Sequence, residues 1–218
     1  MARQYRTLGE LRAEMRAMLG HASAGSGSAG VNTTIVDTHL RNAQTRLYWT
    51  HDWAHLRRYE ELTLGQHETL LDYPDTADPD RIRYVSVYRG GVWSPPIERG
   101  ISPSMYTYQT NYSWPQRWEP YEQMEFWPST DQSYPVRVFF IKALGRLTED
   151  GDRFSIDDTL TSIVAIATLK AHYRQPDAKI HMDASESLLV SLKSKSWGKT
   201  VFRPNEWTAE PLVRPQTI

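Results

Sequence analysis

The apolar positions between Thr34 and Leu56 repeat at the spacing of an α-helix, and the rest of the chain is organised around this stretch. They form one apolar stripe, whose members are Val36, Leu40, Ala43 and Leu47. Thr34 and Asp37 stand at the spacing of a capping box, so we expect the helix to begin there. The sequence therefore predicts a long amphipathic helix.

The end of this stretch is aromatic and then changes character. Tyr48, Trp49 and Trp53 follow the stripe, and from Arg57 the residues RRYEELTL alternate in the way of a β-strand. We therefore expect a joint between helix and β-region, at which the helix ends in bulky aromatic residues and the first strand begins. The residues assigned to this joint are Trp49, Asp52, Trp53 and Leu56.

A shorter helical pattern precedes the long helix. Thr7 and Glu10 form a capping box, and the apolar residues after them predict a helix that ends at Gly20. Residues 21–30, HASAGSGSAG, then form a small-residue linker. This linker is not a phosphate-binding loop, because no Lys-Ser or Lys-Thr pair follows its glycines.

The middle of the chain alternates between apolar and polar positions, which is typical of β-strands. We expect a hairpin of residues 57–64 and 68–73 about Gly65-Gln66, followed by a loop over residues 72–80. Further strands are predicted at 82–88, 92–93, 117–127 and 134–144. Turn signals at this spacing predict a small antiparallel sandwich or barrel.

Helical spacing returns after this region. Ser155 and Asp158 form a third capping box for a strongly apolar helix, and Pro176 begins another helix that runs to about Lys195. The order predicts an α+β fold, a bundle of about four helices with an inserted β-module. The expected domains are a helical domain of residues 1–56 and 148–195, a β-module of residues 57–147, and an extended C-terminal arm of residues 196–218.

The predicted arm has three prolines and no regular period, yet it is too apolar for a solvated tail. We expect it to lie either on a neighbouring chain or on its own domain. Its candidate interface residues are Trp197, Phe202, Arg203, Trp207, Leu212 and Val213.

Composition narrows the classes of partner. Lys and Arg total 25 against 26 for Asp and Glu, and no dense basic cluster marks a nucleic-acid binder. The chain has no Cys, which excludes disulfides and thiolate metal sites, and no apolar run of about 18 residues predicts a membrane helix. Eight Trp and twelve Tyr fit either surfaces that meet other chains or a Trp-rich β core.

One group of residues suits metal chemistry. His51 and His55 could share a helix face as zinc ligands, with Asp52 as a general base, and the chain would then be a zinc hydrolase. A third ligand is not apparent, and the pair falls where helix changes to strand. No nucleophile or cofactor motif is present either. The sequence therefore predicts neither an enzyme nor a cofactor.

The order and spacing of residues in the first part of the chain form a further pattern. The residues that carry it are Ile35, Val36, Leu40, Asn42, Ala43, Gln44, Leu47, Asp52, Trp53, Leu56, Leu62, Thr63, Leu64, Gly65 and Gln66. Together with the inserted β-module and the arm, this pattern resembles the head-to-tail adaptor proteins of short-tailed phages, the connector or tail tubular type.

The resemblance implies a structural virion protein at the head–tail junction, assembled in the host cytoplasm. Members of this family form a dodecameric ring below the portal, continue the DNA channel for genome retention and ejection, and give the tail nozzle or fibres a docking surface. The implied partners are copies of this chain, the portal protein, tail proteins, and double-stranded DNA that passes without sequence-specific binding. No membrane is implied. A glycan- or receptor-binding module that uses the aromatic stretch Tyr106–Trp118 is the other alternative, beside the zinc hydrolase.

Overall fold

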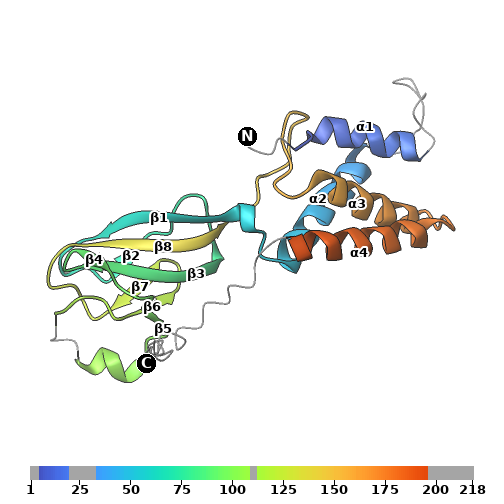
Figure 1. Cartoon of the computed structure of the whole chain (residues 1–218). Helices are drawn as coiled ribbons and strands as arrows, with labels where there is room; N and C mark the ends of the chain where they lie inside the picture. The colour runs from blue at the N-terminus through green and yellow to red at the C-terminus, as the bar shows by residue number, and fades with distance from the viewer. Residues whose placement is uncertain (1–4, 20–32, 109–111, 196–218) are drawn as a thin grey trace, which may run out of the picture. The chain divides into compact units, whose positions relative to one another are not determined.

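The chain folds into a helical unit and a β unit. The computed structural model describes residues 5–19, 33–108 and 112–195 (Figure 1). The helical unit lies within Met1–Leu56 and Ala143–Gly198, and the β unit is Arg57–Lys142. The chain thus leaves the helical unit after Leu56 and returns at Ala143, earlier than the predicted return at residue 148. The predicted arm, residues 196–218, lies outside the described residues.

The predicted α+β class is confirmed, because the described residues contain four α-helices and a set of mostly antiparallel strands. The helices are α1 (Leu8–Met18), α2 (Thr33–Thr50), α3 (Asp158–His172) and α4 (Ala178–Lys195), and a short 3-10 helix spans Ala54–Leu56. No helix in the described ranges is both long and apolar enough to cross a membrane.

The third helix is the centre of the helical unit. α3 packs against α1, α2 and α4 (Figure 1), and it is buried on nearly every side because most of its residues are small or apolar. The stripe predicted for α2 is confirmed, since all of its members are buried: Val36, Leu40, Ala43 and Leu47.

Local signals in the sequence fix the start of α1. The predicted capping box is present: the Thr7 hydroxyl accepts from the Glu10 amide, and the Glu10 carboxylate accepts from the Thr7 amide. The amides of Leu8 and Gly9 donate to the carbonyls of Asp152 and Asp150, at 2.9 and 3.0 Å. A Cβ at Gly9 would stand 3.3 Å from the Asp150 carbonyl oxygen, so glycine allows this close approach.

The two other predicted capping boxes are wrong. Thr34 lies inside α2, and the Asp37 carboxylate is bound by Arg12 of α1 at 2.8 and 3.0 Å. At α3 the N-cap is Asp157, whose side chain accepts from the Leu160 amide, while Asp158 accepts from Arg6. Arginines from a distant part of the chain therefore bind carboxylates that local spacing alone would assign to helix N-caps.

The β unit consists of two four-stranded sheets that share one core (Figure 1). The first sheet has the order β1 (Arg57–Leu64), β8 (Tyr134–Lys142), β3 (Ala77–Arg89) and β4 (Val92–Trp93). The second has the order β2 (Leu70–Leu71), β7 (Met124–Trp127), β6 (Arg117–Pro120) and β5 (Glu98–Arg99). A 3-10 helix, Pro103–Tyr108, follows β5, and β5 pairs with β6 in parallel while the other pairs are antiparallel. Apolar side chains of both sheets interdigitate in the core, as expected for the predicted sandwich.

The predicted hairpin of residues 57–64 with 68–73 is wrong. β1 pairs along its whole length with β8, whereas β2 pairs with β7 of the other sheet. Thr130 explains the crossing: its hydroxyl donates to the Gly65 carbonyl, and its own carbonyl accepts from the amide of His67. His67 has φ 62°, so the chain turns there towards the second sheet.

Three predicted boundaries also change. α2 ends at Thr50 rather than continuing to Leu56, and β3 already begins at Ala77, inside the predicted loop. Residues 117–127 form two strands, β6 and β7, because the chain turns between them, where the Tyr121 amide donates to the Gln123 carbonyl. The turn predicted after β3 is confirmed, with Gly90 and Gly91 at positive φ.

Candidate interaction surfaces

The structure separates the four residues assigned to the joint. Trp53 and Leu56 are buried in the helical unit, and the Trp53 indole donates to the Leu47 carbonyl at 2.9 Å. Trp49 is 56% exposed. It lies one helical turn beyond Thr45, which is also exposed, so both side chains are on the outer side of α2. Asp52 is partly exposed in the segment after the helix. Only part of the predicted joint is therefore core, and Trp49 is surface.

The two histidines of the zinc hypothesis do not share a helical face. α2 ends at Thr50, so His51 follows the helix and His55 lies in the 3-10 helix. The His51 ring packs edge-on against Trp53, with centroids 5.3 Å apart, and His55 Nε2 donates to the Ser155 carbonyl at 2.8 Å. Among residues 5–19, 33–108 and 112–195, no three His, Cys, Asp or Glu side chains are grouped closely enough to hold a metal ion.

The aromatic stretch of the glycan hypothesis, Tyr106–Trp118, is largely engaged within the β unit. Trp118 is a core residue, and Trp114 packs against the core with the Arg89 guanidinium 4.8 Å from its ring centre. The Tyr106 hydroxyl donates to Glu125, and burial together with this carboxylate raises the pKa of Tyr106 to about 12. Tyr112 is exposed beside His67. The described part of this stretch thus mainly supports the β unit's own packing.

A different aromatic surface lies on the outer face of the first sheet. Tyr59 and Tyr84 flank Phe139 from the two neighbouring strands, with ring centroids 5.5 and 4.2 Å from that of Phe139. The Arg137 guanidinium lies 4.0 Å from the ring centre of Trp93 and 5.0 Å from that of Tyr59. The sequence alone does not predict this surface, because it depends on the pairing of β1 and β3 with β8. The only signal is the alternation within each strand.

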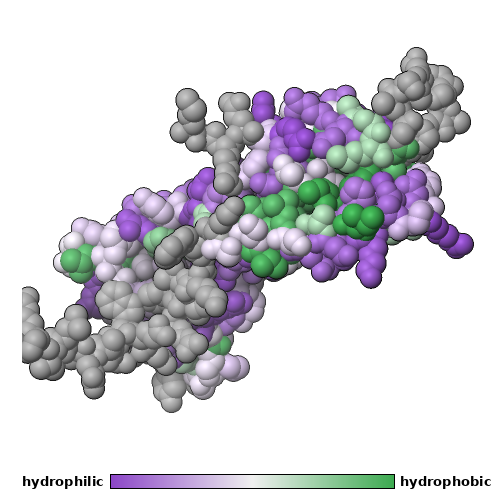
Figure 2. All heavy atoms as spheres, turned by 45° about the vertical axis from the view of Figure 1, so that its right-hand side comes forward, coloured by the Kyte–Doolittle hydropathy of each residue, from purple (hydrophilic) through white to green (hydrophobic). Residues whose placement is uncertain are grey.

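The helical unit also exposes apolar side chains. Figure 2 shows apolar surface on this unit beside hydrophilic patches, and the exposed large apolar residues there are Met18, Trp49, Tyr173, Ile180 and Val190. α4 packs against α3, yet none of its large apolar side chains is fully buried. These exposed apolar side chains are candidates for contact with a partner, since contiguous exposed apolar patches mark interaction sites.

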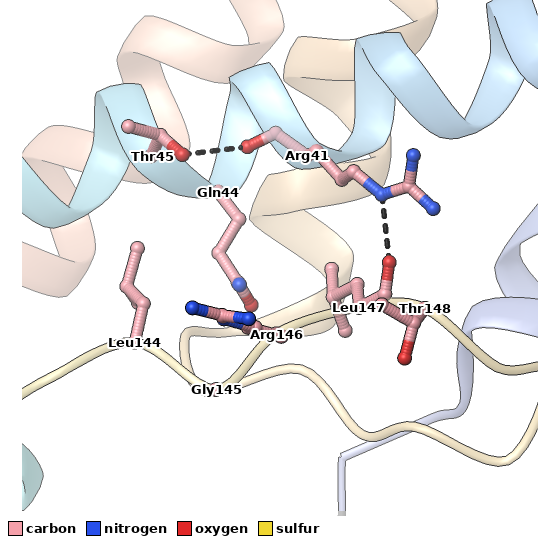
Figure 3. A pocket seen from close by; sticks show the side chains of 8 residues that line it. All are labelled: Arg41, Gln44, Thr45, Leu144, Gly145, Arg146, Leu147 and Thr148. Atoms are coloured by element: carbon pink, nitrogen blue, oxygen red, sulfur yellow. Dashed lines mark hydrogen bonds between the residues drawn. The ribbon is translucent and has the colours of Figure 1, made fainter. Parts of the chain in front are cut away.

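A cleft of about 320 Å³ opens between α2 and the loop of residues 144–148 (Figure 3). Arg41, Gln44 and Thr45 of α2 line one side, and the loop contributes Leu144 and Arg146 among others. Figure 3 shows the Gln44 side chain pointing from the helix towards Arg146.

Two hydrogen bonds fix the shape of this cleft. The Arg41 Nε donates to the Leu147 carbonyl at 2.7 Å, and Gln44, which is buried, accepts from the Ser155 amide at 2.9 Å. No residue lining the cleft is acidic. The cleft is therefore an electropositive notch, with Arg41 and Arg146 beside the apolar side chains of Leu144 and Leu147.

The predicted interface residues of the arm, Trp197 to Val213, lie outside the described residues. Comparison of the whole sequence with known protein families and with curated proteins finds no match.

Proposed function

We propose that this chain is the subunit of a ring that joins the portal of a phage head to the tail and continues the DNA channel. In this proposal the protein acts by assembly in the virion, at the head–tail junction, and it has neither a catalytic site nor a cofactor. Its partners are copies of itself, the portal protein, and the nozzle or fibre proteins of the tail.

The observation that carries the proposal is the presence of exposed apolar surface on both units. Trp49, Ile180 and Val190 are exposed on the helical unit, and Tyr59 and Val92 are exposed on the β unit. A protein that must bind neighbours in a ring and also further proteins above and below needs several separate contact surfaces. Exposed aromatic and apolar residues are enriched at such contacts.

The charge balance agrees with a channel through which DNA slides. The net charge is −1, and a strong grip on phosphates would require an excess of Lys and Arg. In this proposal double-stranded DNA passes without sequence-specific binding. The arm with Trp197, Phe202 and Trp207 contacts the portal or a neighbouring subunit.

Single-particle imaging of the purified chain, alone and mixed with the portal ring of the same phage, tests this proposal. We expect rings that stack coaxially on the portal. Dispersed subunits that ignore the portal would contradict the proposal. Stoichiometric zinc in the purified chain would favour the hydrolase that uses His51 and His55, and glycan binding by the monomer would favour a receptor-binding module.

A further inference from the structure

The first described segment of the helical unit, residues 5–19, is held by contacts with distant parts of the chain. The amides of Leu8 and Gly9 donate to carbonyls of the loop before α3, and Thr7 is opposite Arg153 in an isolated antiparallel bridge. The fully buried side chains of α1 are those of Leu8, Leu11 and Met15. The segment therefore docks on a surface built by α2, α3 and the loop before α3.

Ion pairs fix the segment on this surface. The Arg12 guanidinium binds Asp37 of α2 and Asp150 of the loop, with nitrogen–oxygen distances of 2.8 and 2.6 Å. The Arg6 Nε donates to the Asp158 carboxylate at the start of α3, at 2.9 Å. We call the surface that carries Asp37, Asp150 and Asp158, together with the backbone of the loop before α3, the α1 site.

The connection from α1 to α2 is longer than this docking requires. The Arg16 side chain donates to the Thr33 hydroxyl, so the last turn of α1 lies within the reach of one side chain from the first residue of α2. Adjacent helices in bundles are usually joined by about 2–8 residues. Here residues 20–32 stand between the two helices in the sequence, and they are mostly Gly, Ala and Ser.

A connection of this length also reaches a neighbouring subunit. Residues 20–32 can span up to about 45 Å when fully extended. A unit of about 100 residues has a radius of gyration of about 13 Å, so equivalent points on two units in contact are roughly 30–40 Å apart. The segment of residues 5–19 can therefore reach the α1 site of another copy with all of its own contacts unchanged.

We propose that residues 5–19 of one copy occupy the α1 site of the next copy in the assembled ring. This inference rests on the proposed ring and names a contact that builds it. The occupant is a second copy, because the α1 site already matches this segment in its buried apolar residues, its ion pairs and its backbone hydrogen bonds. The exchange converts contacts within one subunit into contacts between subunits.

A head-to-tail exchange suits a ring. Each copy gives residues 5–19 to one neighbour and receives the same segment from the other, so the contact is heterologous, and a heterologous contact that closes on itself produces a ring. A free subunit instead fills its own α1 site, because the connection keeps the segment at a high local concentration.

Cysteine cross-linking tests the exchange, since the chain has no Cys of its own. Thr7 and Arg153 are directly opposite one another in their bridge, and the Cα atoms of such a pair are about 4.5–5.5 Å apart, within the range that a disulfide spans. The Thr7→Cys/Arg153→Cys chain is assembled under reducing conditions and then oxidised. We expect covalent dimers and larger oligomers on a non-reducing gel.

The matched control for this experiment places the second cysteine elsewhere. Glu60 is exposed on β1 of the β unit, so the Thr7→Cys/Glu60→Cys chain should stay monomeric on the same gel. Thr7 is also the N-cap of α1, and thermal unfolding verifies that both double variants fold.

Shortening the connection tests its reach independently. A chain without residues 22–29 keeps residues 20, 21 and 30–32 between α1 and α2, which suffices for docking within one subunit. We expect this chain to keep the Tm of the wild-type free subunit but to lose ring formation about tenfold or more in negative-stain images and in sedimentation. Replacing residues 22–29 with Gly-Ser repeats of the same length is the matched control and should leave assembly normal.

The outcomes separate this inference from the adaptor proposal. If the wild-type chain forms rings but oxidation of the Thr7→Cys/Arg153→Cys rings gives only monomers with an internal disulfide, the exchange is wrong while the adaptor proposal stands. Normal rings from the chain without residues 22–29 would also contradict the exchange. If the wild-type chain forms no ring with or without the portal, the adaptor proposal itself fails, and the exchange fails with it.

Discussion

Trp53 is the residue at which the end of α2 is fixed. Its side chain is 4% exposed, and its indole donates to the Leu47 carbonyl. Replacing it with Ala would remove a large buried ring and leave that carbonyl without this donor. We therefore expect Trp53→Ala to lower the free energy of unfolding by about 3–5 kcal/mol, as measured by chemical denaturation.

The matched control is the other tryptophan of the same region. Trp49 is mostly exposed, so Trp49→Ala should change the free energy of unfolding by no more than about 0.5 kcal/mol. Equal losses from the two variants would show that burial does not distinguish these side chains.

His39 makes the helical unit sensitive to pH. Burial lowers its pKa, and the neighbouring His172 of α3 lowers it further, while its Nδ1 lies 3.0 Å from the Thr168 hydroxyl. The unfolded chain then binds a proton more readily than the folded chain below about pH 6.5. We expect the free energy of unfolding to fall as the pH drops from about 6.5 through the lower folded-state pKa.

Thermal unfolding of the wild type and of His39→Gln across this pH range measures the effect. The variant removes the titrating group, so the difference in Tm between the two chains should change with pH below about 6.5 and stay constant above it. A constant difference across the whole range would contradict the assignment. His172→Gln should raise the pKa of His39 and weaken the dependence.

At the level of single residues, the sequence predicts burial better than it predicts polar roles. The stripe of α2 is buried because its spacing alone determines which side faces the core. Spacing assigns Asp37 and Asp158 to helix caps, but Arg12 and Arg6 bind them across the fold. Such ion pairs depend on how the helices pack against one another. The spacing of residues within one helix carries no information about that packing.

At the level of elements, Arg12 connects α1 to the rest of the helical unit. It binds both oxygens of Asp37, and the two side chains are only 14% and 11% exposed. Arg12→Met would leave the Asp37 carboxylate buried without its partner, so we expect a loss of about 3 kcal/mol in the free energy of unfolding. Denaturant unfolding measures this loss, and Asp37→Asn in the same chain should recover part of it.

An exposed ion pair provides the comparison for Arg12. Arg117 and Glu98 pair between β6 and β5 with side chains 33% and 64% exposed, so Arg117→Met should cost less than about 1 kcal/mol. If Arg12→Met and Arg117→Met lower the free energy of unfolding by the same amount, burial does not explain how much the Arg12–Asp37 pair stabilises the fold.

The strands show where prediction from sequence stops. The alternation of residues 57–64 and 134–142 identifies β1 and β8, yet the turn signal at Gly65-Gln66 predicts the next strand in sequence as the partner of β1. Thr130, far along the chain, forms hydrogen bonds with the turn after β1, and the residues after this turn join the second sheet. Strand existence follows from local alternation, whereas strand pairing depends on such distant hydrogen bonds. The aromatic surface of Tyr59, Phe139 and Tyr84 could not be predicted for the same reason.

For the whole molecule, the pairing of β1 with β8 explains how one unit is inserted in the other. Arg57, where the chain enters the β unit, is opposite Ile141, next to the residue at which it leaves. Paired antiparallel residues are about 5 Å apart, so the two connections to the helical unit start side by side. The helical unit can therefore close its own core around α3 although its two segments are distant in sequence.

This geometry predicts that the β unit can be removed without unfolding the helical unit. Replacing residues 57–142 with a Gly-Ser linker of about four residues spans the small gap between the two connections. We expect the shortened chain to keep its helical circular dichroism and a cooperative thermal transition, and residues 57–142 alone to fold as a β protein, since each unit has its own core. An unfolded helical remainder would show that the helices depend on the β unit, and the two cores would then have to be treated as one cooperative structure.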